Sequence, residues 1–392
     1  MELFWLEHKK LWRKKIVKIC VLLCFVYCVI FGSILSFQWF CFGSSDDYTS
    51  AFGNNFDGYT VIKDSQEYAL SFGGELTDET LQKIVSDYQQ MTDWQIVNSW
   101  LGTLYPELRD TSNYKTMISY VDPDKLTGFY ERRQQVLDEF LEVSGQVGAE
   151  KEFLHQIERK VEKPFRYEWV EGWSTLLGSM VADLGVVMAL FLGIVLSSLF
   201  AGEWHDNTST LVLTTRNGWG KIALAKILTG LAFTVELFAL LAVSSVISQL
   251  FFMGTAGWNM PIQNIKLIAV APMNMLQAEI YEYAFVLLGA IGFAGIVMFI
   301  SAAVKNNVLT LLLSLAVVYG PMMIAEYLPY EMQKALDLIP LVGSSTDIFR
   351  TNTFRIFGKL IWSPYLLITI PVLIGILCMP FAIKSWSRRM KA

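Results

Sequence analysis

Three residues that could take part in chemistry stand within four positions, at Glu203, His205 and Asp206, between two long apolar runs. Carboxylates and an imidazole so close together could bind a metal or act as acid and base in hydrolysis. A zinc site, however, needs three or four ligands, and the whole chain has only three histidines and no His-Glu-x-x-His motif. We therefore predict neither a metal site nor a catalytic site here.

A nucleotide site is not indicated either. Gly220 and Lys221 are similar to the end of a phosphate-binding loop, where Ser or Thr follows the Lys. In this chain Ile222 follows Lys221, and the preceding glycine is wrongly spaced. The sequence predicts a chain that is not an enzyme and binds no cofactor.

The elements that must position these residues are strongly apolar. Of 392 residues, 53% are hydrophobic and 17% charged, and the mean hydropathy is +0.40, whereas soluble domains contain about 25% charged residues. A helix that crosses the hydrocarbon needs about 20 apolar residues. Six runs reach this length, at 19–40, 176–200, 222–253, 283–304, 308–327 and 362–383. We predict an all-α integral membrane protein with six transmembrane helices, of which the overlong third could tilt or break.

Charge is segregated along the chain. Residues 41–174 contain 24 acidic and 12 basic residues, a net charge of −12, while the remainder contains 12 acidic and 19 basic residues, a net charge of +7. Basic residues flank the spans on one side, which the positive-inside rule assigns to the cytoplasm. Both termini are then predicted inside and residues 41–174 outside. The basic residues are expected to face membrane lipid rather than nucleic acid.

The predicted domains follow from these runs. Residues 1–18 show an aromatic arc opposite a basic arc, which is typical of a helix lying on the membrane surface. The segment 41–174 is too long for a loop, and its periodicity predicts a mostly helical extracytoplasmic domain, with a helix after Asp122 that breaks near Gly145 and Gly148. The complete division is 1–18 interfacial helix, 19–40 first span, 41–174 extracytoplasmic domain, and 175–392 the other five spans, with a cytoplasmic coupling loop at 201–220 and a re-entrant-like outer loop at 328–361.

Acidic residues at membrane depth are a second group of candidates. Asp183, Glu236 and Glu326 fall in or near the second, third and fifth spans. A charged side chain inside a bilayer is costly, so each should face protein or water. They could line a translocation path, or they could form polar pairs between helices. Glu279 and Glu282 are expected to be solvated at the outer edge of the fourth span.

Small residues repeat at helical spacing within two spans. Gly289, Gly292 and Gly295 predict close helix packing, with substrate passage as the alternative. Three cysteines, one turn apart on the first span, predict a helix contact rather than a metal or redox site: Cys20, Cys24 and Cys28.

The loop between the second and third spans carries the most specific pattern. It contains, in order, Phe200, Glu203, Thr208, Leu211, Leu213, Thr214, Thr215, Arg216 and Lys226. With the layout of the spans, this pattern resembles the permease subunits of ABC-2 type ABC transporters. Asn207 stands where that family usually has Gly, and Arg216 follows the Thr pair where Pro is usual.

The resemblance implies the membrane subunit of a bacterial exporter in the cell membrane. It would pair with a second permease, identical or homologous, and with two separate ATPase subunits that hydrolyse ATP. The implied ATPase-coupling residues are Glu203, His205, Asp206, Thr208, Thr214, Thr215 and Arg216. The cargo could be an antimicrobial peptide, a drug or a lipid-like compound. Two alternatives are a membrane sensor or scaffold with an outer ligand-binding domain, and an ion-coupled carrier that uses Glu236.

Overall fold

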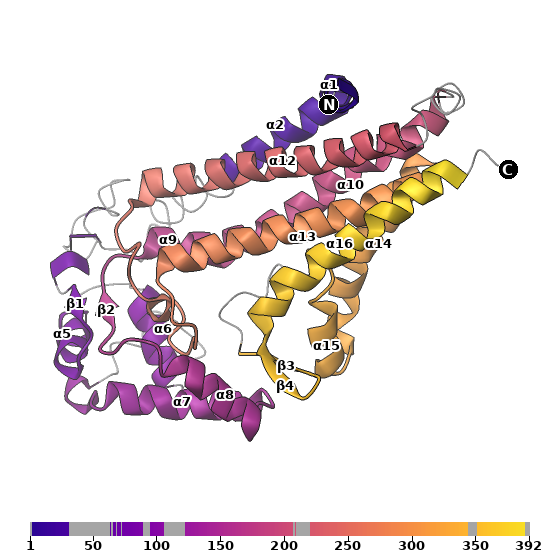
Figure 1. Ribbon diagram of the computed structural model, residues 1–392. Helices are drawn as coiled ribbons and strands as arrows, with labels where there is room; N and C mark the ends of the chain where they lie inside the picture. The colour runs from indigo at the N-terminus through magenta and orange to yellow at the C-terminus, as the bar shows by residue number, and fades with distance from the viewer. Residues whose placement is uncertain are drawn as a thin grey trace.

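The chain forms a mostly helical structure, seen in a computed structural model (Figure 1). The structure describes residues 2–30, 63, 66–67, 69–71, 73–88, 95–105, 122–206, 208, 220–343 and 351–388. The α-helices are α1 (Glu2–Arg13), α2 (Lys15–Val29), α5 (Asp78–Tyr88), α6 (Gln95–Leu104), α7 (Phe129–Val143), α8 (Ala149–Glu158), α9 (Glu171–Thr175), α10 (Val181–His205), α12 (Lys221–Met253), α13 (Met275–Ala303), α14 (Asn307–Ile324), α15 (Tyr330–Leu336) and α16 (Ser363–Arg388). Short turns of other helix types are η4 (Pro123–Lys125), η5 (Leu176–Met180), η6 (Ile262–Asn264) and η7 (Ala325–Tyr327).

Five helices are long and apolar enough to cross a membrane. They are Asp183–His205, Lys221–Met253, Met275–Ala303, Asn307–Tyr327 and Ser363–Ser387. These match the last five predicted spans, which supports a multi-pass membrane protein. The expected first span is described only in part, because α2 ends at Val29 and residues 31–40 lie outside the described residues. A sixth span therefore stays a prediction.

Helices α5 to α9 form a globular domain at one end of the bundle (Figure 1). The predicted breaks are confirmed, since α7 ends before Gly145 and α8 begins after Gly148, both with positive φ. Asp78, in the first turn of α5, accepts hydrogen bonds from the backbone N–H groups of Gly128 and Phe129 at 2.7 and 3.0 Å. Its carboxylate therefore caps the start of α7, which joins two helices that are distant in sequence.

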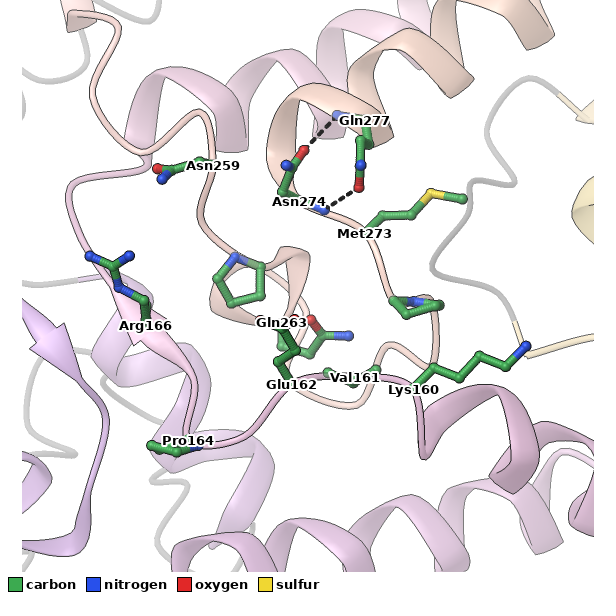
Figure 2. A pocket seen from close by; sticks show the side chains of 12 residues that line it. Lys160, Val161, Glu162, Pro164, Arg166, Asn259, Gln263, Met273, Asn274 and Gln277 are labelled. Carbon is green, nitrogen blue, oxygen red and sulfur yellow. Dashed lines mark hydrogen bonds between the residues drawn. The ribbon is translucent and has the colours of Figure 1, made fainter.

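The globular domain is tied to the loop between α12 and α13, residues 254–274. The fully buried Arg133 of α7 donates to the carbonyl oxygens of Leu267 and Ala269 and pairs with Glu158 at 2.6 Å. The indole of Trp169 donates to the carbonyl oxygen of Met253, the last residue of α12. At the other end of this loop a capping box of Asn274 and Gln277 starts α13 (Figure 2). The domain and the loop therefore form one connected unit.

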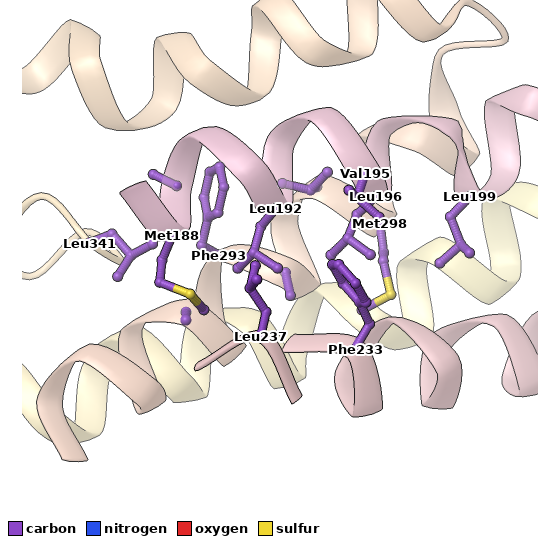
Figure 3. Close-up of a cluster of buried hydrophobic side chains, with 14 of the residues drawn as sticks. Met188, Leu192, Val195, Leu196, Leu199, Phe233, Leu237, Phe293, Met298 and Leu341 are labelled. Atoms are coloured by element: carbon purple, nitrogen blue, oxygen red, sulfur yellow. The ribbon is translucent and has the colours of Figure 1, made fainter. Parts of the chain in front are cut away.

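The bundle encloses a continuous apolar core. Met188 and Leu192 of α10 meet Phe293 of α13 and Leu237 of α12 within a cluster of buried side chains (Figure 3). The three cysteines of α2 are buried in the same cluster, as the predicted helix contact requires. Exposed apolar side chains cover the outer surfaces of α2, α12, α14 and α16, where a lipid environment would cover them.

Close approach of α13 and α16 depends on glycine. A Cβ added at Gly292 would lie 2.2 Å from the carbonyl oxygen of Pro371, and one at Gly295 would lie 2.4 Å from that of Gly375. Neither distance is tolerable for a real side chain, and the obstructing atoms are backbone. Gly289 is less constrained, since its Cβ would meet Leu341 at 3.1 Å. The packing role predicted for these glycines is confirmed.

The predicted fold class needs one correction. The chain is not purely α-helical, since the described residues include two antiparallel pairs, β1 (Gly74–Glu75) with β2 (Arg166–Tyr167), and β3 (Thr353–Ile356) with β4 (Lys359–Trp362). Phe357 and Gly358 both have positive φ, the backbone that a tight hairpin turn demands. The outer loop predicted at 328–361 thus contains α15 and a hairpin, and its re-entrant character stays a prediction.

The prediction that Glu279 and Glu282 are solvated is wrong, because both side chains are buried. Helix α13 begins at Met275, eight residues before the apolar run in the sequence, so its first turns already pack inside the protein. Tyr283, one residue further, packs edge-on against Phe238 of α12 with ring centroids 6.0 Å apart. The overlong α12 neither breaks nor ends early, and α14 continues through Pro321.

Candidate functional site

Glu203 lies in the last turn of α10 and is 4% exposed. One carboxylate oxygen, Oε1, accepts from Lys10 Nζ of α1 at 2.6 Å and from Lys226 Nζ of α12 at 2.8 Å. The other oxygen, Oε2, accepts from the hydroxyl of Thr208, which follows α10 within the predicted coupling loop, residues 201–220, whose first five residues belong to α10. A single carboxylate therefore joins three helices and the loop.

Lys226 completes this arrangement. Its ammonium group is 2.8 Å from Glu7 Oε2 of α1 as well as from Glu203, and the residue is 1% exposed. A charge buried so deeply needs paired partners, which the two carboxylates provide. We call Glu7, Lys10, Glu203, Lys226 and Thr208 the ion cluster.

Electrostatics within the ion cluster favour its charged form. Burial alone would lower the pKa of Lys10, but the hydrogen bond and the charge of Glu203 outweigh burial and raise that pKa. Lys14, at the bend after α1, donates to Ser198 of α10 at 3.0 Å. Burial, together with the charges of Lys226 and Lys10, lowers the pKa of Lys14. Lys10 of α1 and Lys14, which follows α1, therefore both bind side chains of α10.

Helix α1 also holds Glu236, a candidate for the translocation path. The Glu236 carboxylate accepts from Trp12 Nε1 at 3.0 Å and lies 3.2 Å from His8 Nε2. Helix α12 has 33 residues and is about 50 Å long, roughly 20 Å more than the hydrocarbon thickness. Glu236 lies at the middle of this helix, and α1 contacts α12 both there and at Lys226.

The remaining residues of the opening triplet do not enter the ion cluster as ligands. His205 is the last residue of α10 and Asp206 follows it, and both side chains are exposed. Trp204, between them and Glu203, packs against Trp386 of α16 with ring centroids 6.0 Å apart. Lys305, after α13, lies 4.4 Å from the centre of the Trp204 ring. The end of α10 is thereby fixed on two sides, while His205 and Asp206 project from it.

The other predicted site residues are not all described and are not gathered in one place. Thr214, Thr215 and Arg216 lie outside the described residues. Asp183 is exposed at the start of α10, where it interacts with Tyr27 of α2, and Glu326 is exposed in η7. No path through the bundle can be drawn from these positions.

The geometry of the ion cluster suits it to hold helices together. Among the described residues, no group of three or more His, Cys, Asp and Glu side chains could hold a metal ion. The oxygens of Glu203 are occupied by Lys and Thr donors, which leaves this carboxylate poorly suited to act as a base. What the ion cluster can do is hold the end of α10, α1 and α12 at fixed relative positions.

Glu7 was missed as a site residue by sequence reasoning. The available signal was its position with Lys10 and Lys14, since residues at i, i+3 and i+7 share one face of a helix. An acid and two bases on one face of an otherwise basic segment indicate a face that meets charged protein groups.

The chain was compared with protein-family models, curated proteins and solved structures, and none of them matches it.

Proposed function

We propose that the chain is the membrane subunit of an ATP-driven exporter, coupled to separate ATPase subunits through residues 201–220. The observation that carries this proposal is the buried Glu203, which binds α1, α12 and Thr208 at the point where α10 leaves the bundle. A force applied at this loop would act on three helices at once. The resemblance of residues 199–227 to ABC-2 permeases implies that the ATPase subunits bind at this same loop.

The remaining assignments belong to the same proposal. The chain would lie in a bacterial cell membrane with both termini in the cytoplasm and the globular domain outside. It would act with a second permease copy or homologue and two ATPases. Its cargo would be an antimicrobial peptide, a drug or a lipid-like compound. The exposed His205 and Asp206 are the described residues best placed to touch an ATPase, since they project beyond the fixed end of α10.

The test is co-purification with ATP-binding cassette subunits encoded beside this chain. Asp206→Arg changes an exposed charge next to the ion cluster without replacing any of its members, so it should weaken the complex with a smaller loss of melting temperature than Glu203→Lys. Glu203→Lys should abolish both coupling and local packing. Glu142→Lys, on an exposed surface of the globular domain, is the matched control and should leave the complex unchanged.

Two outcomes would overturn the proposal. One is a stable permease that forms no complex with any neighbouring ATPase. The other is a complex that Asp206→Arg, His205→Glu and Glu203→Lys all leave intact.

A further inference from the structure

The β3–β4 hairpin ends in a fully exposed aromatic side chain. Phe357 and Gly358 form the turn, and Phe357 is 101% exposed, more than any other large apolar residue that the structure describes. Both turn residues have positive φ, for which Asn or Asp followed by Gly is the favoured sequence. A phenylalanine here is unfavourable both for the backbone and for solvation by water. The side chain therefore indicates a contact outside the chain.

Chain connectivity places this hairpin at a membrane boundary. It lies between two consecutive membrane-length helices, Asn307–Tyr327 and Ser363–Ser387, so the end of the first and the start of the second lie at the same membrane face. Strand β4 ends at Trp362, and α16 begins at the next residue. The turn begins six residues before α16, so it is at most about 20 Å from the start of that helix.

The hairpin is held by the bundle and by the globular domain. Trp362 is buried and packs edge-on against Tyr365 of α16, with ring centroids 6.0 Å apart. Lys334 of α15 donates to the carbonyl oxygen of Thr353 at 3.3 Å, and the Thr353 hydroxyl donates to Gln146 of the globular domain at 2.8 Å. Figure 1 shows the hairpin beside α15, across the end of the bundle that carries the globular domain. The turn is therefore kept close to the membrane boundary.

Exposed aromatic residues mark the same boundary. Tyr327 ends the α14 span and is 85% exposed, and Tyr365, in the first turn of α16, is exposed as well. Tyrosine and tryptophan are enriched at membrane–water interfaces, where their rings lie among the lipid headgroups. The exposed Lys359, which follows the turn, is placed to pair with a lipid phosphate, whereas Arg355 already pairs with Glu150.

We propose that the turn of the β3–β4 hairpin inserts into the headgroup region of the membrane, with the Phe357 ring directed toward the acyl chains. Lipid is the partner that this position favours, because apolar side chains on the helices at either side of the hairpin are exposed too. These are Met323 and Ile324 of α14 and Leu373 of α16. A bilayer covers all of these side chains together with the ring of Phe357.

Membrane contact at the turn would fix the orientation of the globular domain. The same hairpin binds this domain, through Thr353 with Gln146 and through Arg355 with Glu150. The domain is then held in two places, by the hairpin and by the loop between α12 and α13. The inference needs only that the long apolar helices cross a membrane, so it does not depend on the proposed coupling to ATPases.

The first experiment measures depth with nitroxide labels on single cysteines, in a chain whose native cysteines are replaced, in vesicles of phosphatidylcholine and phosphatidylglycerol. Oxygen is enriched in hydrocarbon and a nickel chelate stays in water, so the ratio of their collision rates reports depth. Phe357→Cys should give a higher ratio than Val143→Cys, on the globular domain, and a lower ratio than Leu373→Cys, within α16. A ratio at 357 equal to that at 143 would overturn the proposal. Low collision rates with both reagents at 357 would also overturn it, because they would show that protein covers the turn.

The second experiment keeps the turn and removes the ring. Phe357→Asn gives the Asn-Gly sequence that this turn prefers, so without lipid contact it should slow amide hydrogen exchange in the hairpin. If the membrane holds the turn, loss of the ring should instead speed exchange at residues 353–362 in vesicles. Val147→Asn, at another exposed apolar residue next to Gln146, is the control and should leave this exchange unchanged. Slower or unchanged exchange in Phe357→Asn would contradict the proposal.

Discussion

Lys226 Nζ lies 2.8 Å from Glu203 Oε1, and the two residues come from different helices, α12 and α10. Both are nearly fully buried, so neither charge can be satisfied by water. Replacing one partner would leave the other charge buried with too few counter-charges. Removal of a single member of such a pair generally costs about 3–5 kcal/mol.

We expect Glu203→Gln and Lys226→Met each to destabilise the chain, and the double variant to be less destabilised than the sum of the two. The reason is that the double change removes both charges instead of stranding one. Thermal unfolding in detergent at one scan rate would measure the shifts. Additive shifts would contradict the coupling of these two residues.

Arg133→Met should loosen the globular domain from the loop between α12 and α13. The substitution keeps the apolar stem but removes the donors to Leu267 and Ala269 and one partner of Glu158. We expect a loss of about 3–5 kcal/mol and faster amide hydrogen exchange in residues 254–274. Lys125→Met, on an exposed side chain, is the control. Unchanged exchange in this loop would show that Arg133 does not hold it.

Stability should fall as pH rises because of Glu171. Burial raises the pKa of this carboxyl, in α9 of the globular domain, from its ordinary 4.5 to about 7. Between these values the folded chain retains a proton that the unfolded chain has released. The protonated Glu171 therefore contributes up to about 3 kcal/mol to the free energy of unfolding. This contribution is fully present below pH 4.5 and is lost as the pH rises to about 7. In Glu171→Gln the difference between melting temperatures at pH 4.5 and 7 should shrink, and an unchanged difference would refute this assignment.

Gly292→Ala should disrupt the contact between α13 and α16. Its methyl group would overlap the carbonyl oxygen of Pro371, so the helices must separate. We expect reduced yield of folded protein and a melting temperature lower by several degrees. Gly320→Ala, in α14, has open space around the added methyl group and should be neutral. Equal effects of the two substitutions would indicate that helix propensity, rather than close packing, determines the result.

Membrane topology can be tested by cysteine labelling in whole cells, after replacement of the native cysteines. Val143→Cys is on an 89% exposed side chain of the globular domain and should react with an impermeant maleimide. Asp206→Cys should react only after the membrane is permeabilised. The reverse pattern would place residues 201–220 outside and rule out the proposed coupling to cytoplasmic ATPases.

The apolar runs predicted six spans, and five of them coincide with membrane-length helices of the structure. Hydropathy locates the apolar part of each helix but not its ends, and α13 begins eight residues before its apolar run. It does not report which polar groups meet. The contacts of Glu236 with His8 and Trp12 of α1 were therefore not predicted.

The candidate site was predicted only at Glu203 and Thr208, through the loop pattern. Glu7 and Lys10 join it because α1 folds back across α12, a long-range contact that local periodicity cannot reveal. Burial of Glu279 was missed for a similar reason, since it depends on the turns that α13 adds before its apolar run. The two small strand pairs are too short to produce a readable alternation.

Helix α12 contains no proline and runs unbroken from Lys221 to Met253. At one end Lys226 is fastened by two carboxylates, and at the other the Met253 carbonyl is held by Trp169 and Gln66. Without a proline there is no sequence cause for a sharp kink in this helix. One continuous helix thus connects the ion cluster at one end with the residues beside the globular domain at the other.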